Sequence, residues 1–548
     1  MKLLAIFLLL TGLLFSKQSF SQRKLIEKQQ HVIDQAIQNA YPACVRMWGF
    51  NVQQNQRTSA QFSGVVVTAD GYILTAAHTT IPGTNYKVFF PDGRDCIAVA
   101  LGRIDNPSTP GMPDVGMMKI IDKGKWPFAA MGNSAGLKSN EFCVSIAYPE
   151  SLNLEKPTVR IGIIAEGRNN YGFIRSTCKM EPGDSGGPLF DYLGRVIGLH
   201  SAIDVPEDQN FEIPVNLYRK YWNALMQEKT YTSFPDSDSS SVILPAKNTE
   251  KLILTHQLQP IEKNKNSCFV ISSSQGGRIQ QILATLINKK IKGINKQFLI
   301  SKNTEVGENP SIVAYPEAGL KICMRDVSND LILMELANPV KGGVDLIDPM
   351  LTPFSIGKLL FSSMPNHSSI VGVMSTLELS LPKITSQAYL GAMVMFNSQP
   401  AQFSLIKPNS PASGAGIRVG DELLQINSKQ INHAKEFAPE MLKVWPNESI
   451  ALSWKSGNQT HTENILLEAI ALPNSKHPAD KFSGGKSLRR DGLESIFIQD
   501  ATIKSNECGS PVFDGDGRFY GINIARYSRT ATVVMPVLTL NTLFADIL

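Results

Sequence analysis

The chain has 548 residues, of which 43% are hydrophobic and 18% are charged, so it is long enough for about two to four globular domains. Acidic and basic residues are interspersed and the formal net charge is only +5, which argues against a nucleic-acid-binding role. The seven cysteines form no metal-ligand spacing, and their odd number leaves at least one thiol outside any intramolecular disulfide.

The N-terminus predicts an exported protein. Lys2 precedes an apolar run from Leu3 to Phe15, and small residues lead to a cleavage site near Ser21–Gln22; this pattern is typical of a signal peptide, here residues 1–21. The apolar run is shorter than the ~20 residues that span a bilayer. The mature protein is therefore expected to be periplasmic or secreted, with no stable membrane span. An uncleaved membrane anchor is the alternative.

The next segment combines one helix with many strands. Apolar residues from Leu25 to Ile37 recur at helical spacing, and Pro42 ends that helix. From Cys44 to about Leu217, short β-branched runs alternate with turn dipeptides such as Asp70-Gly71, which predicts an all-β barrel or sandwich. A further helix is expected from Leu217 to Gln227.

A linker separates two related parts of the chain. The Ser- and Asp-rich residues 229–249 favour a linker that ends a first domain at residues 22–228. Beyond it the features recur in the same order. The turn Pro188-Leu189-Phe190-Asp191 has a counterpart in Pro511-Val512-Phe513-Asp514. This repetition indicates an internal duplication.

The second copy is too long, and the surplus lies at residues 387–468. We therefore expect the second copy to comprise residues 250–386 and 469–548, interrupted by an inserted domain.

The hexapeptide Gly183-Asp184-Ser185-Gly186-Gly187-Pro188 is the strongest chemical signal. A serine hydroxyl needs a neighbouring base to act as a nucleophile, and N–H donors to stabilise the oxyanion that forms. Gly183 permits a turn that points the amides of Gly183 and Ser185 into one oxyanion hole, and we expect Gly186 and Gly187 to leave room for substrate. A glycine-rich hairpin turn with a chance serine is the alternative.

His78 and Asp114 complete a catalytic triad with Ser185. His78 ends the strand-like run Thr75-Ala76-Ala77 and is the candidate general base, and Asp114 would hold its imidazole in the tautomer that accepts the serine proton. Asp114 is preferred over Asp105 and Asp122 because an apolar strand follows it directly. A lone histidine at a strand end is usually structural, but the aspartate and serine motif downstream favour catalysis.

The order His, Asp, Ser matches the chymotrypsin arrangement, and the residues resemble the HtrA branch of the trypsin-like proteases over about Ala36 to Leu217. The resemblance implies a double six-stranded β-barrel with the site in its cleft. With the duplication, we expect a mainly β fold of two chymotrypsin-like double β-barrel units, the second degenerate and interrupted by the inserted domain. The resemblance also implies unfolded or misfolded exported proteins as substrates, as in protein quality control, and no metal or nucleotide cofactor. The matching stretches are Ser63-Gly64-Val65, Asp70 to Thr75, Gly132-Asn133-Ser134 and Gly194 to Gly198.

Two features depart from the HtrA pattern. Such enzymes commonly carry asparagine before the nucleophile, whereas this chain has Asp184, whose role stays open. Their PDZ domains normally follow the protease directly, whereas here a second barrel intervenes. The likeness and the N-terminal helix make a homotrimer plausible, unless the second barrel replaces those contacts.

The second copy has lost its catalytic residues. Alignment of the two halves places Cys508 opposite Ser185, Asn303 opposite His78 and Asp330 opposite Asp114. Asparagine cannot act as a general base, so we expect a structural or regulatory pseudo-protease. A cysteine protease built on Cys508 is the alternative, and Ser510 is a poorer candidate because a proline follows it.

Residues 387–468 resemble a PDZ domain. The amides of Leu390, Gly391 and Ala392 would receive the terminal carboxylate of a peptide that adds a strand to the sheet. Residues His433 to Val444 would form the helix beside the groove, although Pro439 interrupts the helical pattern. A purely structural β-rich insert is the alternative.

These features together predict an exported serine endopeptidase of HtrA type that also binds C-terminal peptides. A catalytically silent peptide-binding scaffold or chaperone is the alternative, and the complete triad argues against it. The specificity pocket is expected near Cys178 to Pro182 and His200 to Ala202, where no aspartate indicates a preference for basic residues.

Overall fold

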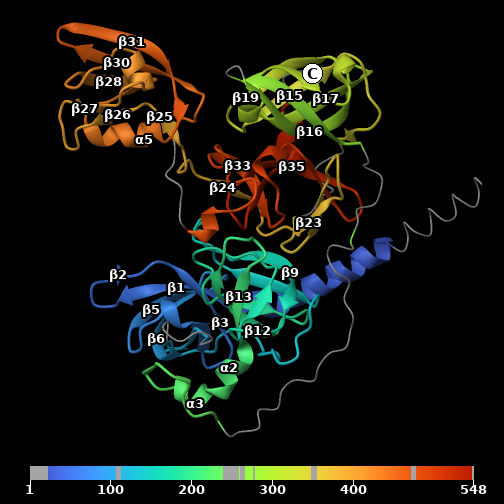
Figure 1. The fold of residues 1–548 in the computed structure, drawn as a ribbon, viewed down its shortest axis with the longest axis vertical. Helices are drawn as coiled ribbons and strands as arrows, with labels where there is room; N and C mark the ends of the chain where they lie inside the picture. Colours follow the sequence, from blue (N-terminus) through green and yellow to red (C-terminus); the bar gives the residue numbers. More distant parts are fainter. Residues whose placement is uncertain are drawn as a thin grey trace, which may run out of the picture.

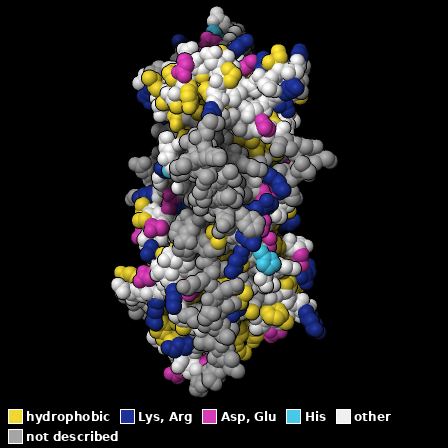
Figure 2. Space-filling view, turned by 90° about the vertical axis from the view of Figure 1, so that its right-hand side faces the viewer, with side chains coloured by type: hydrophobic (Ala, Val, Ile, Leu, Met, Phe, Trp, Pro, Cys, Tyr) yellow, Lys and Arg dark blue, Asp and Glu magenta, His cyan; other side chains and the backbone are white. Residues whose placement is uncertain are grey.

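The computed structural model describes residues 22–105, 113–238, 258, 266–275, 278–346, 354–470 and 477–545. The predicted signal peptide and most of the predicted linker lie outside these residues. The described chain is mainly β and forms a first unit, a second unit of similar plan and a smaller inserted unit (Figure 1). Within it, no helix has the length and apolar character needed to cross a membrane. On the face shown in Figure 2, acidic and basic side chains are interspersed.

The first barrel of the first unit is a closed ring of six strands. The order is β6-β5-β1-β3-β4-β7, and β7 pairs back with β6. The two-residue strand β14 (Thr230–Tyr231) adds to β6 in parallel, beyond the predicted domain end at residue 228. The ring consists of β1 (Cys44–Asn51), β3 (Phe62–Val66), β4 (Tyr72–Ala76), β5 (Asn85–Phe89), β6 (Asp95–Ile104) and β7 (Val115–Ile120), and β2 (Gln56–Arg57) pairs with β1.

The second barrel is closed in the order β10-β13-β12-β11-β8-β9. Strands β8 and β11 are nearly continuously apolar, as is typical of strands buried on both faces, and every one of their residues is buried. Where the sequence predicts one helix, two short ones follow the barrel, α2 (Val215–Lys220) and α3 (Trp222–Leu225). The strands are β8 (Phe142–Ala147), β9 (Thr158–Glu166), β10 (Ile174–Ser176), β11 (Pro188–Phe190), β12 (Val196–Ile203) and β13 (Asn210–Pro214).

The N-terminal helix, residues 22–40, connects the two units. Its apolar residue Ile33 belongs to one core cluster with residues of the first unit and with Phe361 of the second. The Gln30 side chain donates to the carbonyl of Gly357 (3.0 Å) and accepts from the amide of Leu359 (2.7 Å). The second unit of the same chain therefore covers part of the face that we expected to be available for a trimer.

The first half of the second unit repeats the plan of the first barrel. Its order, β18-β15-β16-β17-β20-β19, corresponds to β5-β1-β3-β4-β7-β6. No ladder joins β18 to β19 among the described strands, so this sheet is open where its counterpart is closed. The strands are β15 (Cys268–Gln275), β16 (Arg278–Ile291), β17 (Ile294–Lys302), β18 (Glu308–Ile312), β19 (Leu320–Asp326) and β20 (Leu331–Leu336), and β21 (Val344–Asp345) pairs with β16.

The second half repeats the second barrel. The order β23-β22-β34-β35-β36-β33 corresponds to β9-β8-β11-β12-β13-β10, and a single bridge from Met374 to Gln499 joins its ends. The predicted fold class, mainly β with two chymotrypsin-like units and a degenerate second, is confirmed. The elements are β22 (Leu359–Ser362), β23 (Ile370–Val373), β24 (Leu379–Leu381), β33 (Leu493–Gln499), β34 (Pro511–Asp514), β35 (Phe519–Arg526), β36 (Thr532–Pro536) and α6 (Val537–Thr542).

The inserted unit lies between β24 and β33 and has its own core, which includes Leu452 and Trp454. Strand β25 (Ala388–Tyr389) pairs with β32 (Glu468–Ala469), so the two ends of the insert meet. In place of the predicted helix over residues 433–444, η8 (Ala434–Glu436) leads into α5 (Phe437–Met441). The remaining elements are β26 (Ala392–Val394), β27 (Phe403–Ile406), α4 (Pro411–Gly414), β28 (Glu422–Ile426), β29 (Lys429–Gln430), β30 (Ser449–Ser456) and β31 (Gln459–Leu466).

The separate core predicts a local effect of mutation. Leu452 is fully buried in β30, so Leu452→Ala should destabilise the inserted unit by about 2–5 kcal/mol without lowering the stability of the first unit. Proteolysis of the folded protein, followed by fragment mapping, measures this. Leu466→Ala is the control, because Leu466 is 59% exposed and its loss should cost less than about 0.5 kcal/mol. Equal losses for the two variants would contradict a separate core.

Candidate active site

Two of the three predicted catalytic residues are in direct contact. Strand β4 ends at Ala76, and the short helix η2 (Ala77–Thr79) carries His78. The amide of His78 donates to Oδ1 of Asp114 (2.7 Å), and its ring Nδ1 forms a short hydrogen bond with Oδ2. The contact follows from the register of the sheet, because β4 and β7 pair with Ala76 opposite Val115, the residue after Asp114.

Asp114 also sets the protonation of His78. Burial alone would lower the pKa of His78, but the hydrogen bond and the charge of Asp114, with a further contribution from Asp105, raise that pKa above its ordinary value. Because Nδ1 contacts Asp114, Nε2 is the ring atom left to exchange a proton with a substrate or nucleophile. The side chain is 47% exposed, so this nitrogen is accessible.

Ser201 is a second residue that contacts the Asp114 carboxylate, and sequence reasoning missed it. Its hydroxyl, on β12, donates to Oδ2 of Asp114 (3.0 Å). The only signal in the sequence was its place within the segment His200 to Ala202, which we expected to line the pocket. Ser201 helps to fix the carboxylate that orients His78, and it ties the second barrel to the first.

The turn that carries Ser185 is held from both barrels. The carbonyl of Ser185 accepts from the amide of Ser63 on β3 (2.9 Å), and the Ser63 hydroxyl donates to the carbonyl of Gly183 (2.8 Å). On the other side, the amide of Gly186 donates to the carbonyl of His200 on β12 (2.7 Å). The turn of Ser185 is therefore bonded to both barrels.

The glycines of this turn allow close packing of the protein against itself. Gly183 has φ +94° and Gly186 has φ +77°, a region that favours glycine. A Cβ on Gly186 would lie 2.0 Å from Oγ1 of Thr75, and one on Gly187 would lie 2.6 Å from Cβ of Ala147. The expectation that Gly186 and Gly187 leave room for substrate is wrong, because protein atoms fill the space beside them.

Two amides of the turn are available to bind an anion. Among the residues that the structure describes, nothing accepts a hydrogen bond from the N–H of Gly183 or of Ser185. The amide between them, that of Asp184, donates to the carbonyl of Glu181 (3.0 Å). The described side chains of Ser185 and His78 form no hydrogen bond with each other, and catalytic hydrogen bonds of this type commonly tighten only when substrate binds.

A second histidine near the turn has a different character. His200 is fully buried, its Nε2 lies 2.6 Å from the hydroxyl of Ser145, and its Nδ1 lies 3.6 Å from the carboxylate of Glu212. Burial, with a smaller effect from the charge of Arg160, lowers the pKa of His200 to about 3. His200 is therefore a neutral core residue, and His78 is the histidine suited to proton transfer.

The corresponding turn of the second unit carries Cys508. The amide of Gly509 donates to the carbonyl of Asn523 (2.6 Å), as Gly186 does to His200, so Cys508 lies opposite Ser185 as the alignment predicts. The thiol is fully buried, and burial raises the pKa of Cys508 to about 11. A buried, protonated thiol is a poor nucleophile, which argues against a cysteine protease in this unit.

The alignment of the base position was wrong by one residue. In the second unit the amide of Thr304 donates to Oδ1 of Asp330 (2.8 Å) and its hydroxyl to Oδ2 (3.1 Å), the same contacts that His78 makes with Asp114. Asn303 corresponds instead to Ala77, because its amide donates to the Asp330 carbonyl. The buried ammonium of Lys302 also pairs with Asp330, and threonine, like asparagine, cannot act as a base.

The predicted peptide-binding residues of the inserted unit form the start of a strand with one free edge. Leu390 is buried in the core, and the carbonyl of Gly391 accepts from the amide of Lys407 (2.7 Å). The amide of Met395 donates to the carbonyl of Gln402 on the same side (2.9 Å). Hydrogen-bonding groups alternate along an antiparallel strand, so the backbone groups of Ala392 point away from β27.

Comparisons with known proteins agree with the first unit. Residues 62–199, which include His78, Asp114 and Ser185, match a family model described as a trypsin-like peptidase domain. A DegP-like periplasmic serine endoprotease of Bartonella henselae is 25% identical over 393 residues, which cover 68% of each chain. Similarly named proteins of Chlamydia trachomatis and Rhizobium meliloti are 22% and 21% identical and cover 74% and 71% of each chain.

Among solved structures, a serine endoprotease from Yersinia pestis aligns with 80% of this chain and 98% of its own, at 17% identity and a TM-score of 0.30. An HtrA-type protease, AlgW with a tripeptide, aligns with 81% and 98% at the same identity and TM-score. The matched family model and the names of the relatives support a serine endopeptidase with a trypsin-like peptidase domain, similar to DegP-like endoproteases.

Proposed function

We propose that the protein is an exported endopeptidase that hydrolyses unfolded or misfolded proteins, with Ser185 as nucleophile, His78 as general base and Asp114 as the residue that orients His78. The observation that carries this proposal is the set of hydrogen bonds that both barrels make with these residues. Asp114 holds both the amide and the ring of His78, while Ser63 and His200 bind the Ser185 turn to the same two barrels.

The proposed reaction is acyl transfer in two steps. The Ser185 hydroxyl attacks a peptide carbonyl and gives its proton to Nε2 of His78, and the amides of Gly183 and Ser185 stabilise the oxyanion that forms. The C–N bond then breaks, and His78 returns the proton to the leaving amine. Water, activated by His78, hydrolyses the acyl-enzyme and regenerates the free hydroxyl.

The names of the relatives support an exported location, since they are described as periplasmic endoproteases. Unfolded protein as substrate follows from the resemblance to HtrA enzymes. The silent scaffold is not favoured, because the first unit keeps a histidine and an aspartate in contact and a serine on a turn that both barrels hold. The second unit shows the contrast expected of an inactive copy. At the positions of the triad it carries Thr304, Asp330 and a buried Cys508.

The inserted unit is proposed to bind peptides along β26. The edge of this strand opposite β27 offers the backbone groups of Ala392 and Val394, and a peptide strand added there would satisfy them. Partly buried apolar side chains, including Val394, Phe437 and Met441, pack on the core of the insert and would contact the side chains of the peptide. The amides of Leu390, Gly391 and Ala392 are the proposed binding site for its terminal carboxylate.

Ser185→Ala should abolish cleavage of unfolded casein, lowering kcat by a factor on the order of 10⁶ because no nucleophile remains. Cys508→Ala is the matched control and should retain full activity, since the buried thiol lies in the other unit. Both are measured with the mature protein by release of soluble peptides. Loss of activity in Cys508→Ala alone would reverse the assignment of the active unit.

The pH profile tests the roles of His78 and Asp114. Only neutral His78 can accept the serine proton, so kcat/KM should fall as the pH drops through the raised pKa of His78, with a midpoint above its ordinary value of 6.5. Asp114→Asn removes the group that raises this pKa, so the acid limb should move to lower pH, and kcat should fall by about 10⁴-fold.

Asp105→Asn is the control for long-range charge, because Asp105 contributes least to the raised pKa of His78. It should shift the acid limb in the same direction by less and leave the activity plateau unchanged. An acid limb that stays in place in Asp114→Asn would contradict the assignment of His78 as the titrating base.

Val394→Pro tests the peptide edge. Proline removes the one N–H that β26 would offer at this position, and it is tolerated on an edge strand where that N–H does not bond to the sheet. The affinity for peptides with a free, apolar C-terminus should fall about tenfold, measured by fluorescence anisotropy. Met393→Ala, which changes an exposed side chain on the other face, should bind normally; unchanged binding in Val394→Pro would refute this mode.

A further inference from the structure

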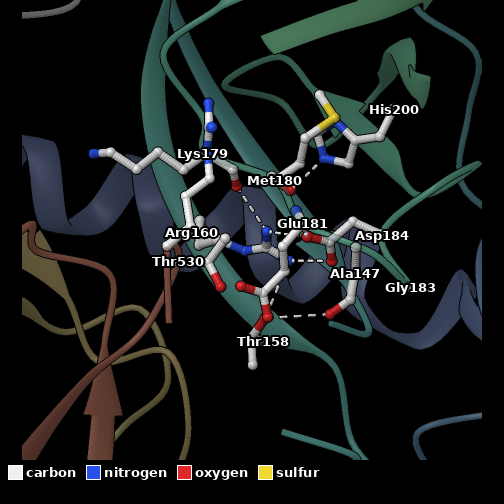
Figure 3. A network of polar contacts seen from close by, with 12 residues as sticks. Ala147, Thr158, Arg160, Lys179, Met180, Glu181, Gly183, Asp184, His200 and Thr530 are labelled. Atoms are coloured by element: carbon white, nitrogen blue, oxygen red, sulfur yellow. Dashed lines mark hydrogen bonds and ion pairs between the residues drawn. The ribbon is translucent and has the colours of Figure 1, made fainter. Parts of the chain in front are cut away.

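The aspartate that precedes the nucleophile has a buried partner. Both oxygens of Asp184 accept hydrogen bonds from the guanidinium of Arg160 on β9, Oδ1 from Nη2 and Oδ2 from Nη1, each at 2.6 Å (Figure 3). Both side chains are almost completely buried, and Nη1 also donates to the carbonyl of Lys179 (2.7 Å). A planar, two-point ion pair of this kind fixes the orientation of both groups.

The pair controls the turn that carries the two free amides. Asp184 lies between Gly183 and Ser185, and its Oδ2 accepts a further hydrogen bond from the amide of Glu181 (2.9 Å). Its carbonyl accepts from the amide of Gly187 (2.7 Å). A rotation of the Asp184 side chain would therefore move the backbone on both sides of the nucleophile.

The second unit holds the strand on which Arg160 lies. The amide of Val159, one residue before Arg160, donates to the carbonyl of Ser375 (3.2 Å). The amide of Ile161, one residue after it, donates to the partly buried carboxylate of Asp500 (2.8 Å). Both acceptors belong to the second unit, so its contacts bracket Arg160 on each side.

A hairpin turn of the second unit, residues 526–530, covers the other side of the cluster. Burial and the charge of Asp184 raise the pKa of Glu181, and hydrogen bonding from Ser151 and from Ser528 of this turn opposes that rise. Arg529 is fully buried and donates to the carbonyls of Asp204 (3.0 Å) and Pro206 (3.1 Å) in the loop that joins β12 to β13. Figure 3 shows Thr530 of this turn beside Arg160 and Glu181.

We infer that the second unit is an internal positioning partner of the active site: through Asp500, Ser528 and Arg529 it holds Arg160 and Glu181 against Asp184 and so keeps the Ser185 turn in its catalytic shape. The inference rests on the proposed function for its effect on turnover. A buried aspartate needs a fixed cation beside it. In this chain the cation is Arg160, and the second unit covers Arg160.

The first test compares two buried arginines of the second unit in the full mature chain. Arg529→Leu removes contacts with the first unit, whereas Arg489→Leu removes donations to the carbonyls of Val327 and Ser328, within the second unit. On a chromogenic peptide, Arg529→Leu should lower kcat by about tenfold or more with little change in KM. Arg489→Leu should leave kcat unchanged once the rate is corrected for the fraction of folded protein. Equal effects would overturn the inference.

The second test is rescue. Arg160→Leu leaves the buried charge of Asp184 without its cation and should lower kcat by about 100-fold. Adding Asp184→Asn removes the unpaired charge, so the double variant should recover at least about tenfold. A purely structural role predicts no recovery. If Arg160→Leu does not fold, Ser528→Ala replaces it in this test, because it deletes only one hydroxyl. Ser528→Ala should lower kcat and leave the melting temperature unchanged.

Amide hydrogen exchange in the Ser185 turn tests the inference independently of enzymatic activity. The amides of Gly186 and Gly187 are hydrogen-bonded and should lose protection in Arg160→Leu and Arg529→Leu but keep it in Arg489→Leu. That pattern supports the inference even if the wild-type protein cleaves nothing, an outcome that would refute only the proposed function. Unchanged protection in all three variants would overturn the inference even in an active enzyme.

Discussion

Two opposite charges, those of Arg160 and Asp184, lie together behind the serine turn with almost no exposure to water. Removing one partner of such a pair typically costs about 3–5 kcal/mol, because the other charge is left buried without compensation. The surrounding backbone is arranged to satisfy the pair, with a carbonyl for the guanidinium and an amide for the carboxylate. The shape of the turn, and with it the direction of its free amides, depends on this arrangement.

The two copies of the fold differ in what they contribute: the first carries the candidate active site, and the second supports it. The first copy keeps a polar, half-open site in which an aspartate orients an accessible histidine. In the second copy the equivalent aspartate, Asp330, is itself fully buried and pairs with Lys302 and Thr304, and its barrel has opened between β18 and β19. Side chains of the second copy bond instead to the first copy, Asp500 to strand β9 and Arg529 to the loop between β12 and β13.

Short motifs in the local sequence predicted the candidate residues; the contact between His78 and Asp114 is seen in the structure, whereas Ser185 as nucleophile stays a prediction. The serine hexapeptide, the aspartate before an apolar strand and the order of the two with His78 are all readable from neighbouring residues. Contacts between distant strands were not readable. Arg160 and Ser201 carry no motif, and only the folded sheet brings them to Asp184 and Asp114. The one-residue error at Asn303 has a similar origin, because the end of a strand is poorly fixed by its sequence.

The helix at residues 22–40 depends on both units for its packing. Its side chain Gln30 bonds to Gly357, 327 residues further along the chain, and its apolar face is completed by strands that follow. A chain that ended before the second unit would leave this helix partly unpacked beside the first.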